Sequence, residues 1–120
     1  MLNLDTHILV ASLAGELTSR EEVLIRNDSL AVSDIVLWEL AKLVQLGRLV
    51  LDMDSVAFRR SLRHLTIIPV SIKIARKSTE LDFRSDPADE LIAATSIVER
   101  IPLLTRDKKI RRSRIVPFAK

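Results

Sequence analysis

Residues 85–95 read Ser-Asp-Pro-Ala-Asp-Glu-Leu-Ile-Ala-Ala-Thr, a stretch that carries the signals of a helix start. Asp86 is a favourable N-cap, Pro87 suits the first helical position, and the carboxylate of Asp89 can return to the N–H of the cap. The two alanines that follow allow close packing against a sheet or another helix. The stretch therefore predicts a helix whose first turn gathers three acidic residues.

The acidic turn also has a purely structural explanation. Carboxylates near a helix N-terminus are stabilised by the positive end of the helix dipole. On this explanation Asp86 caps the helix, Asp89 and Glu90 complement the dipole, and no chemistry follows. The argument for a functional site therefore depends on acidic residues elsewhere in the chain.

Apolar segments that read as short strands alternate with helical patterns along the whole chain. Wholly apolar strands separated by helices indicate a parallel sheet covered on both faces. We expect an α/β fold with three layers, α/β/α, around a central, mainly parallel sheet of four or five strands. The expected strands are residues 1–4, 30–32, 66–70, 101–105 and, at an edge, 115–117, and the expected helices are residues 8–14, 19–26, 34–46, 55–65, 71–81 and 86–100.

The composition limits the classes of function. The chain has 120 residues and no cysteine, so we treat residues 1–120 as a single domain and exclude thiol catalysis, disulfides and thiolate metal sites. No apolar run reaches the roughly 18 residues that a membrane helix needs, and the N-terminus lacks the basic start of a secretion signal. We expect a cytoplasmic protein that does not associate with a membrane.

The net charge of +3 conceals an asymmetry along the chain. Residues 106–120 hold seven basic residues and one acidic residue, a net charge of +6, so the rest of the chain sums to −3. A basic end on an acidic body suits a polyanion held beside a cation site, although a solvated surface segment explains the charge equally well. The polyanion-binding candidates are Arg106, Lys108, Lys109, Arg111, Arg112 and Arg114.

Four acidic residues are expected at one edge of the sheet. Asp5 follows the first strand and Asp107 the fourth, and the carboxyl ends of parallel strands lie along the edge where such sheets bind ligands. Asp89 opens the helix before the fourth strand. Glu39 borders the apolar side of its helix, although an ion pair with Lys42 on a wet face is an alternative.

Several ionised carboxylates at one place repel one another, which raises their pKa values unless a cation lies between them. Ligands that are all oxygen, without cysteine or histidine, favour Mg²⁺ or Mn²⁺ over zinc. An ion held in this way activates water and neutralises charge at a phosphodiester. The four acids therefore predict a divalent metal site.

Four short motifs in this order resemble PIN domains, and the small VapC-type toxins above all. The resemblance covers essentially the whole chain. It rests on an Asp directly after the first strand, a helical Glu, the Asp-Pro-Ala-Asp turn with the apolar residues after it, and an Asp after the fourth strand. These motifs are Leu4-Asp5-Thr6, Val36-Leu37-Trp38-Glu39-Leu40, Asp86-Pro87-Ala88-Asp89 with Leu91-Ile92-Ala93-Ala94, and Leu104-Thr105-Arg106-Asp107.

The resemblance implies a single PIN-like domain and a Mg²⁺-dependent endoribonuclease, the toxin of a toxin–antitoxin pair. It implies that the four acids hold one or two divalent ions and that water activated there cleaves RNA. It also implies a cognate antitoxin and a homodimer as partners. The implied ligands are Asp5, Glu39, Asp89 and Asp107, with Asp86 ranked below them because its cap role accounts for it, and the hydroxyls of Thr6 and Thr105 support them.

Other classes of protein fit less well. A phosphoacceptor receiver domain needs an Asp after the third strand, and a haloacid-dehalogenase-like phosphatase needs a second Asp where this chain has His7. The serious alternative is a non-catalytic module that binds RNA or protein and whose acids are only caps and surface charge. His7 is explained more simply by a local hydrogen bond than as a general base. Trp38 is explained more simply by packing in the core or at an interface than by stacking on a base. No role is assigned to His64.

Overall fold

The computed structural model describes residues 1–120 and has a central sheet of four strands that all run parallel. The strand order is β3-β2-β1-β4, and Leu2 pairs with Leu30 while Leu4 pairs with Leu104. The expected parallel sheet is therefore confirmed, with four strands. They are β1 (Leu2–Leu4), β2 (Leu30–Ser33), β3 (Leu65–Ile68) and β4 (Leu103–Leu104).

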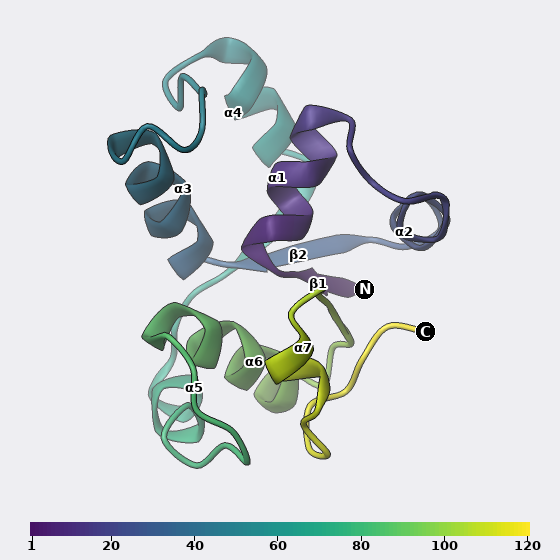
Figure 1. Cartoon of the computed structure of the whole chain (residues 1–120), viewed down its shortest axis with the longest axis vertical. Coiled ribbons are helices and arrows are strands. Elements are labelled where there is room, and N and C mark those ends of the chain that lie inside the picture. The colour runs from purple at the N-terminus through teal and green to yellow at the C-terminus, as the bar shows by residue number, and fades with distance from the viewer.

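Seven helices cover the sheet, and none of them is long and apolar enough to cross a membrane. Figure 1 shows α1, α3 and α4 on one side of the sheet and α5, α6 and α7 on the other, which is the expected three-layer arrangement. The helices are α1 (Thr6–Ala14), α2 (Ser19–Arg26), α3 (Ile35–Gln45), α4 (Val56–Leu62), α5 (Ile72–Lys77), α6 (Pro87–Glu99) and α7 (Lys108–Arg111).

Local signals in the sequence explain where most helices begin. The hydroxyl of Ser55 accepts the N–H of Phe58, and the hydroxyl of Ser71 accepts the N–H of Ile74, both at 3.1 Å. Thr18 and Glu21 form a reciprocal capping box at the start of α2. These caps satisfy N–H groups that the first helical turn leaves without a partner.

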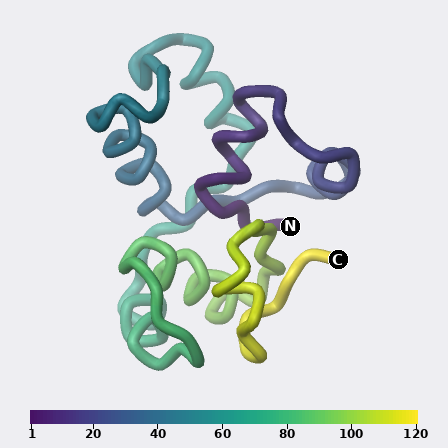
Figure 2. The backbone as a smooth tube through the Cα atoms, viewed as in Figure 1, coloured from purple at the N-terminus to yellow at the C-terminus, as the bar shows by residue number.

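Several expected boundaries were wrong. The helices expected at 55–65 and 71–81 end at Leu62 and Lys77, and β3 ends before Pro69, which has no N–H for a ladder. The expected fifth strand at 115–117 is reduced to one bridge, between Leu103 and Phe118. In Figure 2 the purple N-terminal and yellow C-terminal segments end on the same side of the molecule. Leu103 pairs with Asn3 of β1 and also forms the bridge to Phe118.

The capping box expected at the start of α6 is also wrong. Asp86 occupies the N-cap position but its side chain makes no capping hydrogen bond. Ser85 takes over the local bonds: its N–H donates to Oε2 of Glu90 at 3.3 Å and its hydroxyl donates to Oδ2 of Asp89 at 2.9 Å. The carboxylate of Asp86 is therefore not used by the helix start.

Helix α6 runs back toward the start of β4, so its N-terminus lies at the carboxyl edge of the parallel sheet. Its small residues Ala93 and Ala94 are fully buried, and α6 packs against α5, β2 and α3. Helix α3 begins directly after β2, at that same edge. The packing of α3 against α6 thus brings helices from the two outer layers together where the strands end.

Asn3 is a buried polar residue that ties β1 to α6. Its side-chain amide donates to the carbonyl of Ile92 at 3.1 Å and to the hydroxyl of Ser96 at 2.9 Å, and the residue is fully buried. Asn3 and Ile92 are 89 residues apart along the chain. The position of α6 on the sheet therefore depends on polar bonds as well as on apolar packing.

We expect Asn3→Ala to lower the free energy of unfolding by about 1–3 kcal/mol, because it removes two buried hydrogen bonds. Urea unfolding followed by circular dichroism measures the change. Asn27→Ala, at an exposed position after α2, is the matched control. Equal stability of the two variants would show that Asn3 does not hold the helix.

Candidate active site

Asp5 lies where β1 passes into α1, and it is almost fully buried, with 1% of its surface exposed. Its Oδ1 accepts the N–H of Thr6 at 2.7 Å, which makes it the N-cap of α1. Its Oδ2 accepts the hydroxyl of Thr105 at 2.6 Å, from the end of the neighbouring strand β4. Two adjacent strand ends therefore fix the orientation of this carboxylate.

Glu39 faces the same place from the second turn of α3. Its Oε1 accepts a hydrogen bond from the hydroxyl of Thr6, the residue next to Asp5. The alternative pair with Lys42 does not form, because the Lys42 ammonium donates to Gln45 at 3.1 Å and lies 5.7 Å from the centre of the Trp38 ring. Glu39 therefore points toward the site rather than along the outer face of its helix.

The pKa of Glu39 is raised above its ordinary value, and the charged groups that contribute to this shift lie near its carboxylate. Burial is the largest cause, and the hydrogen bond from Thr6 opposes it. The negative charges of Asp89 and Asp5 raise the pKa further, while His7 lowers it. The carboxylates of Asp5 and Asp89, which come from two other elements, therefore lie close enough to act on Glu39 electrostatically.

Asp89 is half-buried in the first turn of α6, where the Ser85 hydroxyl holds one of its oxygens. Burial raises the pKa of Asp89, and the bond from Ser85 opposes the rise. The charges of Asp5, Asp107 and Asp86 raise the pKa further. Asp107 and Asp86 therefore lie close enough to Asp89 to act on its carboxylate electrostatically.

Asp107 has a structural role that the sequence analysis missed. Its Oδ1 accepts the N–H groups of Lys109 at 2.8 Å and Ile110 at 3.1 Å, so it caps α7, a helix that was not expected. The buried apolar residue Ile110, three positions after an Asp, is the signal that would have found this helix. The cap uses only one oxygen of the Asp107 carboxylate, so the other stays available.

Arg106 does not neutralise Asp107. Its guanidinium pairs with Glu21 of α2 instead, with Nε 2.8 Å from Oε2 and Nη2 2.6 Å from Oε1. The hydrogen bonds from Arg106 are the main reason that the pKa of Glu21 falls to about 2. Of the expected polyanion-binding residues, Arg106 is therefore already engaged within the protein.

The donors fit a hard divalent cation by their chemistry. They are all carboxylates, and the acids around Glu39 and Asp89 raise the pKa values of both, a repulsion that a bound cation relieves. No three acidic or histidine side chains form a ready-made set of ligands in this structure. The structure therefore places carboxylates near enough to act on one another at this edge, and their side chains do not form a set of metal ligands as they stand.

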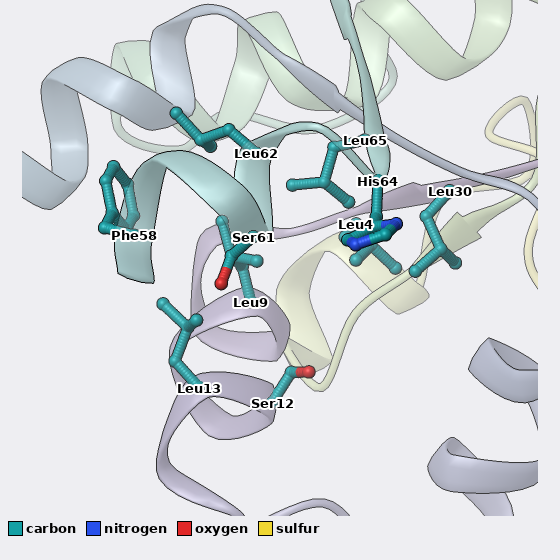
Figure 3. A pocket seen from close by; sticks show the side chains of 10 residues that line it. All are labelled: Leu4, Leu9, Ser12, Leu13, Leu30, Phe58, Ser61, Leu62, His64 and Leu65. Atoms are coloured by element: carbon teal, nitrogen blue, oxygen red, sulfur yellow. The ribbon is translucent and has the colours of Figure 1, made fainter. Parts of the chain in front are cut away.

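The residues left unassigned lie away from this group or at its rim. His7 is exposed next to Thr6, and the Trp38 side chain is 55% exposed on α3. His64 lines an apolar pocket of about 410 Å³ between α1 and α4. Figure 3 shows this pocket, with Phe58 and the leucines around it and no acidic side chain among the lining residues.

A parallel α/β fold with carboxylates from three elements at the strand ends places the chain among α/β domains that carry an acidic site at the carboxyl edge of the sheet. A family model described as the PIN domain matches residues 3–115, so this chain belongs to the PIN domain family. Ribonuclease VapC22 of Mycobacterium tuberculosis is 33% identical over 90 residues, which are 72% of this chain and 69% of that protein.

Solved structures give the same fold. VapBC2 from Rickettsia felis, bound to a DNA fragment from its promoter, is 26% identical with a TM-score of 0.71 and covers 99% of this chain and 98% of that one. FitAcB from Neisseria gonorrhoeae is 18% identical, with a TM-score of 0.72 and coverages of 99% and 97%. A toxin–antitoxin complex from Klebsiella pneumoniae is 23% identical, with a TM-score of 0.70 and coverages of 91% and 88%. The expected PIN-like fold is confirmed.

We expect Glu39→Gln to stabilise the protein at neutral pH when divalent ions are removed with EDTA. A raised carboxyl pKa means that the folded state loses stability as the pH rises through that pKa, and the neutral amide avoids this loss while still accepting from Thr6. The gain in melting temperature should disappear below the ordinary pKa of 4.5.

Thermal unfolding at a series of pH values measures this difference. Glu80→Gln removes the same charge from an exposed acid outside the group and should show no comparable gain. A Glu39→Gln variant less stable than wild type at neutral pH would contradict the electrostatic account of the site.

Proposed function

We propose that this chain is an endoribonuclease that depends on Mg²⁺ or Mn²⁺ and serves as the toxin of a toxin–antitoxin pair. The observation that carries the proposal is that acids from three elements gather at the carboxyl edge, where the charge of Asp5 raises the pKa values of both Glu39 and Asp89. The name of the relative, ribonuclease VapC22, supports the class of reaction. We assign the metal to Asp5, Glu39, Asp89 and Asp107.

Hydroxyl groups hold the proposed ligands in place. Thr105 bonds to Asp5, Thr6 to Glu39 and Ser85 to Asp89. Each carboxylate oxygen has two acceptor positions, so these bonds leave capacity for a cation. When bound, the divalent ion neutralises charge at the phosphodiester and lowers the pKa of a water molecule so that it can attack phosphorus.

Asp86 is proposed as a subsidiary ligand. Its carboxylate makes no capping bond and its charge acts on Asp89, so the reason for ranking it low no longer applies. It is exposed, whereas Glu39 and Asp89 are half-buried. We therefore place Asp86 at the rim of the site, below the other four acids.

The basic residues around α7 are proposed to bind the RNA backbone. Lys108, Lys109, Arg111 and Arg112 are all exposed. The first three lie on α7, which Asp107 caps, and Arg112 follows its last residue. A phosphate bound to these cations lies next to an acid of the site. The C-terminal charge therefore provides a means of holding a polyanion beside the acids that would otherwise repel it.

We propose an antitoxin protein as the partner, a homodimer as the assembly and a single PIN-like domain over residues 1–120. The solved relatives from Klebsiella pneumoniae and Rickettsia felis, a toxin–antitoxin complex and a VapBC2 complex, support the partner. Large apolar side chains also remain at the surface, with Trp38 55% and Ile72 80% exposed. Exposed apolar side chains indicate a surface that another chain covers only where several of them lie together.

A second candidate function is a non-catalytic module that binds RNA or protein. The observation that favours it is that Asp5 and Asp107 both act as N-caps, so the need to cap α1 and α7 explains their presence without any metal. The two candidates differ in one respect that can be measured. The nuclease cleaves RNA in the presence of a divalent ion, whereas the binding module leaves RNA uncleaved under all conditions.

We expect Asp5→Asn and Asp89→Asn each to abolish RNA cleavage while circular dichroism shows an intact fold. The measurement incubates purified protein with a mixed RNA pool, with Mg²⁺ or with EDTA, and maps the cut ends. Asp54→Asn, an exposed acid before α4, is the matched control and should cleave like wild type. Cleavage that persists in EDTA, or in both site variants, would contradict the assignment of these acids as metal ligands.

We expect the triple substitution of Lys108, Lys109 and Arg112 by Gln to weaken RNA binding and to flatten its dependence on salt. For single-stranded RNA, the slope of log K against log salt is negative, and it becomes less steep by about 0.7 for each phosphate that the protein no longer neutralises. Arg111 is left in place because it donates to the carbonyl of Thr105 at 3.3 Å. Binding is measured by fluorescence anisotropy in an Asp89→Asn background, in which we expect no cleavage.

The matched control for this experiment is the basic outer face of α4. Substituting Arg59, Arg60 and Arg63 by Gln removes the same charge from exposed positions on and beside another helix. This control should leave the salt slope unchanged. An equal effect of the two triple variants would show that the protein's net charge, and not α7, determines RNA binding.

A further inference from the structure

The segment 105–107, which follows β4, carries site residues but receives little support from the sheet. Strand β4 consists of Leu103 and Leu104 only, and the N–H of Asp5 donates to the carbonyl of Leu104 at 3.1 Å. No backbone hydrogen bond to a neighbouring strand holds the residues beyond it. The position of this segment therefore depends on side-chain bonds and on the packing of the buried residues that flank it, Leu104 and Ile110.

Thr105 and Arg106, which are adjacent in this segment, have partners in different parts of the molecule. Thr105 donates to Asp5 of the site at 2.6 Å and accepts the N–H of Asp107 at 3.1 Å. Arg106, between them, points away from the acids and reaches α2. Fixing the Arg106 side chain therefore fixes the backbone that carries both neighbours.

The anchor for Arg106 is a mostly buried carboxylate with several hydrogen bonds. Glu21 is only 7% exposed, and its two oxygens receive Nε at 2.8 Å and Nη2 at 2.6 Å in a two-point pair. The carboxylate is held in turn by the N–H of Thr18 at 2.9 Å, and Nη2 also donates to the carbonyl of Glu16 at 3.1 Å. Two-point pairs of this kind set direction as well as distance.

We infer that Glu21 and Arg106 form a positioning pair that orients Thr105 and Asp107, and through them the metal ligands of the site. This inference rests on the proposed function. Helix α2 contributes no acid to the site. On this inference its role is to hold residues 105–107 in place. This inference also removes Arg106 from the residues that contact RNA, because its guanidinium is directed at α2.

The test compares Glu21→Gln with Glu22→Gln on the same helix. Glu22 forms an exposed pair with Arg26 at 4.0 Å, so it supplies the same charge change without a link to the site. Both variants are assayed at a temperature at which circular dichroism shows them folded. The readouts are kcat and KM for RNA cleavage, and Mn²⁺ affinity of the RNA-free protein by electron paramagnetic resonance.

We expect Glu21→Gln to lower kcat and Mn²⁺ affinity by about 10–100-fold, as for other groups that support metal ligands, with KM for RNA unchanged. Arg106→Gln should show the same loss, and the double variant no more than either single one, because the two side chains act as a unit. Glu22→Gln should match wild type in all three quantities.

Two results would overturn the positioning role. One is a Glu21→Gln variant that cleaves RNA and binds Mn²⁺ as the Glu22→Gln variant does. The other is a change confined to KM in Arg106→Gln, which would make Arg106 an RNA contact. A wild-type protein that binds Mn²⁺ but leaves RNA intact would refute the proposed function instead, and the Mn²⁺ comparison would still decide the positioning role.

Discussion

Carboxylates that repel one another are held together at one edge of the sheet, and the design of the site follows from that constraint. The pKa values of Glu39 and Asp89 are raised by the charges around them, yet each of these acids, like Asp5, is fixed by a hydroxyl group. A hydroxyl donates to a carboxylate without adding charge. The protein therefore orients the acids while leaving their charge available to a cation.

The fold supplies this arrangement through its layers. The parallel strands end at one edge, α3 begins there, and α6 returns its N-terminus to the same place. The packing of α6 on the sheet requires small residues such as Ala93 and Ala94, together with the polar tie from Asn3. The site is thus determined by how closely one helix approaches the sheet, and the same contacts stabilise the protein.

The sequence predicted the sheet and the acids better than it predicted their local bonds. Apolar strands followed by Asp5 and Asp107 are visible as a pattern, because parallel strand ends share an edge. The capping box of α6 was mispredicted because the Asp89 carboxylate accepts the hydroxyl of Ser85, the residue before the cap, and the Asp86 side chain makes no capping bond. The four-residue helix α7 is too short for a periodic pattern, and the pair of Glu21 with Arg106 joins residues 85 apart, beyond the reach of any local signal.

The hydrogen bond from Thr105 to Asp5 joins residues that are 100 positions apart. During synthesis Asp5 leaves the ribosome long before its partner exists, because chains grow at about 5–20 residues per second. A nascent chain therefore carries an unfinished cluster of acids for most of its translation. The set of side chains that forms the site is therefore complete only once residues 105–107 have been made.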